Sequence, residues 1–78
     1  MVLFSLWKPS HGGRSFAWVE ALLNSYGIAC VKTGEVSQWH GRYEIAVDDE
    51  DAAETGRLLF VEVGAIQVQA LAPMHDKT

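Results

Sequence analysis

The spacing of apolar residues changes several times along this chain, and these changes constrain the fold more than any other feature of the sequence. Four runs have the two-residue alternation or the β-branched and aromatic content of strands: 2–7, 28–33, 42–47 and 65–71. Two stretches have apolar residues at helical spacing: 15–26, and a second that begins at Asp48 or Asp49 and ends at Gly64. The predicted order is therefore strand, helix, strand, strand, helix, strand.

The first predicted helix has a start signal and a stop signal. The hydroxyl of Ser15 can accept a hydrogen bond from a free backbone N–H at the first turn. Gly27 stands where a residue in the left-handed conformation commonly ends a helix. The stripe predicted to face the core, which Trp18 widens, consists of Phe16, Val19, Leu22, Leu23 and Tyr26.

The second predicted helix opens with four acidic residues, 48–51. Asp48 or Asp49 can cap it, and the other acids favour the positive end of its dipole. Such a run is typical of a solvated helix start and does not by itself indicate a cation site. Ala52, Gly56, Leu59 and Val63 are predicted to face inward. Gly56 costs about 1 kcal/mol of helix propensity relative to alanine, and close approach to the sheet would compensate for it.

This order predicts an α+β protein. Two right-handed crossover units give the ferredoxin-like βαββαβ plait, a four-stranded antiparallel sheet with both helices on one face. The 78 residues are enough for one domain, which we place at 1–72, with a flexible C-terminal tail at 73–78.

Two elements of the sequence resemble a bacterial family of small signal-transducing proteins. The first element contains Leu22, Leu23, Gly27 and Ile28, and the second contains Val47, Glu50, Asp51, Ala52, Leu58 and Leu59. The resemblance covers about half of the chain. It implies a plait fold and a regulatory role, and it brings no catalytic residues with it. The chain departs from the family at Gly56, where alanine is usual.

Composition excludes several classes of function. The net charge of −4 weakens any case for nucleic-acid binding, which usually needs a basic surface. No apolar run is long enough to span a membrane, and no export signal is evident at the N-terminus. The single cysteine, Cys30, cannot form an intramolecular disulfide. A lone reduced thiol without an export signal predicts a cytoplasmic protein.

The loop before the first helix is the best candidate for a ligand site. We expect it to bind a small anionic metabolite, because free N–H groups, close backbone approach and a guanidinium can all hold an anion there. The alternative is a plain loop followed by an ordinary cap. The candidate ligand-binding residues are Ser10, Gly12, Gly13, Arg14 and Ser15.

The sheet face opposite the helices is predicted to be too apolar for a solvated surface. By alternation it displays Leu3, Trp7, Ala29, Val31, Ala46 and Leu71 among Ser5, Arg42, Glu44, Gln67 and Gln69. We therefore expect a homodimer or a protein partner there. The predicted contact residues are Leu3, Trp7, Val31, Trp39, His40 and Leu71.

Trp39 and His40 stand side by side in the loop between the two middle strands. Trp39 either folds over one edge of the small core or contacts a partner, since tryptophan is enriched in binding hot spots. Neither a metal nor another cofactor is predicted, because His11, Cys30, His40 and His75 lack the spacing of a ligand set.

Three functions follow from these features. The first is a non-enzymatic regulatory module that senses a small anion and self-associates through the open sheet face. The second is an adaptor or inhibitor that docks through Trp7 and the Trp39–His40 loop. The third, and least favoured, is a small enzyme that uses His40 or Cys30, for which no set of nucleophile, base and orienting group is visible.

Overall fold

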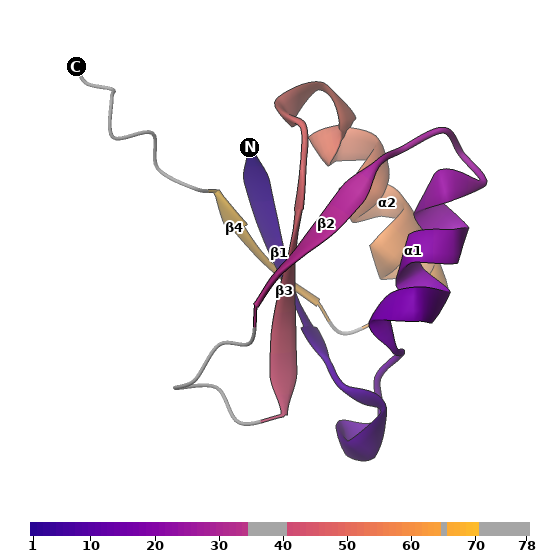
Figure 1. Cartoon of the computed structure of the whole chain (residues 1–78), viewed down its shortest axis with the longest axis vertical. Coiled ribbons are helices and arrows are strands. Elements are labelled where there is room, and N and C mark those ends of the chain that lie inside the picture. The colour runs from indigo at the N-terminus through magenta and orange to yellow at the C-terminus, as the bar shows by residue number, and fades with distance from the viewer. Residues whose placement is uncertain (35–40, 65, 71–78) are drawn as a thin grey trace.

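The computed structural model describes residues 1–34, 41–64 and 66–70, with side chains given for 1–33 and 41–64. It is an α+β structure in which two helices pack on one side of an antiparallel sheet (Figure 1). The strands are β1 (Val2–Trp7), β2 (Cys30–Gly34), β3 (Arg42–Val47) and β4 (Ile66–Ala70). The α-helices are α1 (Phe16–Asn24) and α2 (Ala52–Glu62), and the 3-10 turns are η1 (Pro9–His11) and η2 (Asp49–Asp51). The predicted tail at 73–78 lies outside the described residues.

The sheet is built around the pairing of β1 with β3. Their antiparallel register sets Phe4 opposite Ile45 and Leu6 opposite Tyr43. β2 pairs with the other edge of β3, and the backbone of β4 pairs with the other edge of β1, so the order is β2-β3-β1-β4. Because β1 and β2 both run antiparallel to β3, they are parallel to each other.

One face of the sheet carries the core. Alternate residues of β1 and β3 point toward α1 and α2, because successive side chains in a strand lie on opposite faces. The buried apolar residues that pack together are Phe4, Leu6, Val19, Leu23, Ile28, Cys30, Tyr43, Ile45, Val47, Leu58 and Leu59. The predictions of an α+β class, two helices and an antiparallel sheet are confirmed.

The start and the end of α1 follow the sequence signals. The Ser15 hydroxyl accepts a hydrogen bond from the Trp18 backbone N–H at 3.2 Å, and Gly27 has a φ of 77°. The predicted inward stripe was too wide. Trp18 is 36% exposed and Tyr26 is 53% exposed, because a nine-residue helix on a small sheet buries a narrow face, with Val19 and Leu23 at its centre.

α2 begins differently from the prediction. The acidic run forms η2, and neither Asp48 nor Asp51 makes a side-chain cap hydrogen bond. The inward face is wider than the predicted one: Leu59 is buried and Val63 packs against the core as predicted, and Thr55 and Leu58 are buried in addition. Among the described residues, no helix has both the length and the apolar character that crossing a membrane would need.

Gly56 faces the ring of Phe4 at a distance that would admit a methyl side chain. A Cβ added there would lie 3.6 Å from the nearest Phe4 ring atom, which is ordinary van der Waals contact. We expect Gly56→Ala to raise the free energy of unfolding by up to about 1 kcal/mol, since alanine is the better helix former. Urea denaturation measures the change.

Gly27→Ala is the matched control. Its φ of 77° is strained for any side chain, so this substitution should lower the free energy of unfolding by about 1 kcal/mol or more. A loss of stability in Gly56→Ala would show that α2 lies closer to Phe4 than the structure places it.

The hydroxyl of Thr55 is fully buried in α2 and has no hydrogen-bond partner. An unsatisfied buried hydroxyl costs about 1–3 kcal/mol of desolvation. Thr55→Val keeps the shape of the side chain and removes that hydroxyl, so we expect the free energy of unfolding to rise by about 1 kcal/mol.

Thr33→Val tests the same chemistry at an exposed position. There the hydroxyl donates to the Glu44 carbonyl at 3.4 Å and is solvated, so we expect a change within about 0.5 kcal/mol. If both substitutions change the urea midpoint equally, the hydroxyl of Thr55 is not the cause of the gain.

Candidate functional site

A pocket forms where several chain segments end together. The carboxyl ends of the parallel strands β1 and β2 lie at the same end of the sheet. α1 begins at this end and runs back over the sheet (Figure 1). α1 packs beside β2, in which Cys30 is buried and Lys32 is exposed. The strand ends and the first turn of α1 line an open pocket between them.

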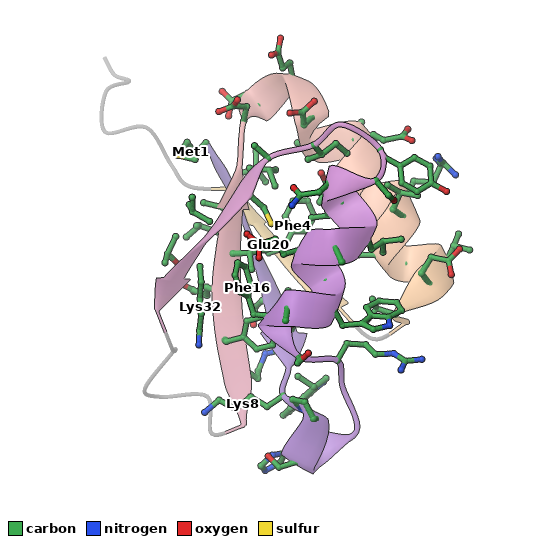
Figure 2. The ribbon with its side chains drawn as sticks, turned by 45° about the vertical axis from the view of Figure 1, so that its right-hand side comes forward. Met1, Phe4, Lys8, Phe16, Glu20 and Lys32 are labelled. Atoms are coloured by element: carbon green, nitrogen blue, oxygen red, sulfur yellow. The ribbon has the colours of Figure 1, made fainter. Side chains whose placement is uncertain are left out.

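This space has a volume of about 230 Å³. We call it the lysine pocket. The described residues that line it are Lys8, Pro9, Ser15, Phe16, Lys32 and Tyr43. In Figure 2, Lys8, Phe16 and Lys32 lie at the end of the sheet where α1 begins, and Glu20 lies further along that helix.

Hydrogen bonds of the backbone hold Lys8 at one side of the pocket. Its N–H donates to the Gly41 carbonyl at 2.7 Å, and its own carbonyl accepts from the N–H groups of His11 and Gly13, each at 2.9 Å. The residue is thereby fixed between the start of β3 and the loop that leads to α1. The position of its side chain at the pocket follows from this network.

Tyr43 forms the back of the lysine pocket and ties it to α1. Its hydroxyl donates to the Arg14 carbonyl at 2.6 Å, which holds the residues before α1 against β3. Burial, with a smaller contribution from Cys30, raises the pKa of the phenol from 10.0 to about 12. The phenol is therefore a neutral hydrogen-bond donor at physiological pH.

Positive charge is concentrated at this pocket in a chain that is acidic overall. Lys32 lies on the helix side of β2, with its Nζ 6.0 Å from the centre of the Tyr43 ring. Lys8 reaches the pocket from the end of β1. Within the described lining there is no carboxylate. Glu44 points to the opposite face of the sheet, because it follows Tyr43 along β3.

The loop predicted to bind an anion uses its N–H groups internally. Gly12 donates to the Pro9 carbonyl at 3.0 Å, and Gly13 donates to Lys8. A Cβ on Gly13 would lie 1.8 Å from the Trp7 carbonyl oxygen, so this glycine is required by packing. The Arg14 guanidinium lies 4.5 Å from the centre of the Trp18 ring. Of the five predicted residues, Ser15 lines the lysine pocket, and Ser10, Gly12, Gly13 and Arg14 do not.

The sheet face opposite the helices is partly covered by its own side chains. Arg42 is 6% exposed and donates from Nε to the Ser5 hydroxyl at 2.5 Å and from a terminal nitrogen to the Ser5 carbonyl at 2.8 Å. Its guanidinium lies 4.5 Å from the centre of the Trp7 ring, which also stacks with His11 at 6.1 Å. We call Ser5, Trp7, His11 and Arg42 the Arg42 cluster. The prediction of an uncovered face is wrong at Ser5 and Arg42.

The other predicted contact residues are divided between covered and exposed positions. Ala46 is buried, Leu3 is half-buried, and Val31 and Ala29 are exposed. Trp39, His40 and Leu71 lie outside the described residues, as do the side chains of Gln67 and Gln69. The exposed apolar surface within the described parts also includes Phe60 and Val61 of α2, which the sequence did not single out.

Cys30 is part of the core. It is buried, and its burial, together with the negative charge of Glu20, raises the pKa of its thiol. A thiol kept neutral in apolar surroundings is a poor nucleophile. Within the described ranges 1–34, 41–64 and 66–70, no three His, Cys, Asp or Glu residues gather as a metal site would require.

The sequence reasoning missed Lys8, Pro9, Phe16, Lys32 and Tyr43 as pocket residues. A signal was present: Lys32 follows Cys30 by two residues and so shares its core-side face, although a lysine cannot be part of a core. An exposed lysine on that face marks a part of the strand that lies beyond the core.

Comparison with protein-family models, with curated proteins and with solved structures found no match to this chain.

The raised pKa of Tyr43 predicts a loss of stability in alkali. The unfolded chain releases the phenol proton first, so the free energy of unfolding should fall as the pH rises from about 10 to about 12. Tyr43→Phe should remove this part of the pH dependence. It should also lower stability at neutral pH by about 1 kcal/mol, because the hydrogen bond to Arg14 is lost.

Urea denaturation of both proteins between pH 8 and pH 11 makes the comparison, because the two proteins differ only in the phenol of residue 43. If the two pH profiles run parallel throughout, the phenol of Tyr43 does not ionise at a higher pH in the folded state.

Proposed function

We propose that this protein is a small binding module whose ligand is a small anion held in the lysine pocket. The observation that carries the proposal is the convergence of Lys8 and Lys32 on one cavity of about 230 Å³. Lysine ammonium groups bind phosphates and carboxylates as point charges. A pocket with this lining favours an anion over a cation or a neutral polar molecule.

The surrounding structure supports a binding role. The lysine pocket combines its charges with the ring side chains of Pro9, Phe16 and Tyr43, and ligand sites generally join apolar walls to a few placed polar groups. The hydroxyl of Ser15 adds a polar atom at the same cavity. Tyr43 fixes α1 over the site through its bond to Arg14, so the pocket is preformed.

We further propose that the fold is the ferredoxin-like plait. The strand order β2-β3-β1-β4, the antiparallel pairing and the two helices on one face support it. Fold does not determine function in this architecture, which carries many activities. The binding role therefore rests on the lysine pocket.

Regulation, signal transduction, self-association through the open face and a cytoplasmic location stay predictions from the sequence. The Arg42 cluster bears on the adaptor hypothesis, since Trp7 is packed between its neighbours and is half-buried. This arrangement favours a structural role for Trp7 and makes anion binding the better supported function.

A titration with inorganic phosphate tests the proposal. The backbone ¹⁵N–¹H signals of Ser15 and Phe16 should shift in a saturable way, with a dissociation constant of about 1 mM. Lys8→Gln and Lys32→Gln should each weaken binding about two- to fivefold, as expected for the loss of one solvent-accessible charge. Ionic strength is held constant with chloride.

Arg57→Gln is the matched control. Arg57 is an exposed cation on α2 that pairs with Glu54 at 2.7 Å and does not line the pocket, so its removal should leave phosphate binding unchanged. Shifts that never saturate, or an equal loss of affinity in all three variants, would show that phosphate senses only the general charge of the protein.

A further inference from the structure

The aromatic side chains of the lysine pocket narrow the class of anion that it binds. Phe16 is the first residue of α1 and is half-buried, with one part packed against the core and another lining the cavity. Tyr43 lies behind it, and Pro9 forms a further wall. A bare inorganic anion would contact the lysines and leave these apolar surfaces in contact with water.

We infer that the ligand of the lysine pocket is a small anion that carries a single aromatic ring, such as an aryl phosphate or an aromatic carboxylate. This inference rests on the anion-binding function proposed above. The ring would lie against Phe16 and Pro9, and the anionic group would lie between Lys8 and Lys32. Aromatic pairs gain stability beyond the area that they bury, and this gain would favour an aryl group over an alkyl group.

The size of the lysine pocket suits a small ligand. Its volume of about 230 Å³ lies below the roughly 300–1,000 Å³ of pockets that hold drug-sized molecules. A single six-membered ring with its anionic group fits such a volume. A nucleotide, which adds a sugar and a fused base to its phosphate, would extend beyond the pocket.

The charges near the pocket restrict where the anionic group can lie. Glu20 stands one helical turn beyond Phe16 on α1 and acts on Cys30, deeper along the sheet. An anion displaced in that direction would meet its carboxylate. The two lysines stand at the open end of the sheet, where α1 begins (Figure 2). The ligand is thus oriented with its ring toward Phe16 and its charge away from Glu20.

Three phosphate monoesters separate the contributions of charge, apolar size and aromatic character. Methyl, cyclohexyl and phenyl phosphate are titrated at pH 8, where all three are dianions, and binding is followed by the ¹⁵N–¹H signals of Ser15 and Phe16. We expect phenyl phosphate to bind about three- to tenfold more tightly than methyl phosphate, and measurably more tightly than cyclohexyl phosphate.

Phe16→Leu should remove most of the preference for phenyl phosphate over methyl phosphate, because it removes the aromatic ring that lines the pocket. Phe60→Leu is the matched control, because Phe60 is 72% exposed on α2 and does not line the pocket; it should change neither affinity. The amide spectrum of each variant reports whether it is folded, and the comparison of the three esters on the unsubstituted protein does not depend on either variant.

The possible results distinguish the two proposals. If methyl and phenyl phosphate bind equally, or cyclohexyl phosphate binds as tightly as phenyl phosphate, the aromatic class is wrong and the anion site remains. If none of the three esters and no inorganic phosphate binds, the proposed function itself is wrong.

Discussion

The antiparallel register of β1 against β3 sets Leu6 opposite Tyr43 and Trp7 opposite Arg42, and the rest of the structure depends on this pairing. On the helix side it places the Tyr43 ring at the end of the core, where its hydroxyl can reach the Arg14 carbonyl and hold the start of α1. On the other side it places the Arg42 guanidinium over Ser5 and Trp7. A one-residue slip would turn all of these side chains to the opposite face.

The two faces of this strand pair differ in the surroundings of their positively charged side chains. The Arg42 cluster buries a guanidinium and compensates for its lost hydration with two hydrogen bonds to Ser5 and the face of an aromatic ring. Such compensation is needed, because an unpaired buried charge is costly. In the lysine pocket, by contrast, two lysines line an open cavity. The first arrangement is typical of a structural element, and the second is typical of a ligand site.

Gly12 and Gly13 in the loop before α1 have a structural role in place of the predicted role in anion binding. Two glycines before a helix are typical of loops that bind an anion at the helix N-terminus, and the sequence prediction followed that pattern. In the structure, Gly12 takes a φ of 88° as the loop turns, and Gly13 lies against the Trp7 backbone. Both serve the tight path from β1 to α1. That path carries Ser15 and Phe16 to the cavity, so the loop contributes to the site by positioning these neighbours.

Local signals in the sequence determined the elements of this protein. The alternation in 2–7 and 42–47, the Ser15 cap and the stop at Gly27 depend on a residue and its near neighbours, so they could be read without a structure. The site could not be read in this way, apart from Ser15. Lys32 and Tyr43 come from β2 and β3 and Lys8 follows β1, and only the strand register and the place where α1 begins bring them together. The burial of Arg42 likewise depended on which residue lies across the strand pair, because side-chain contacts between distant segments are set by tertiary packing.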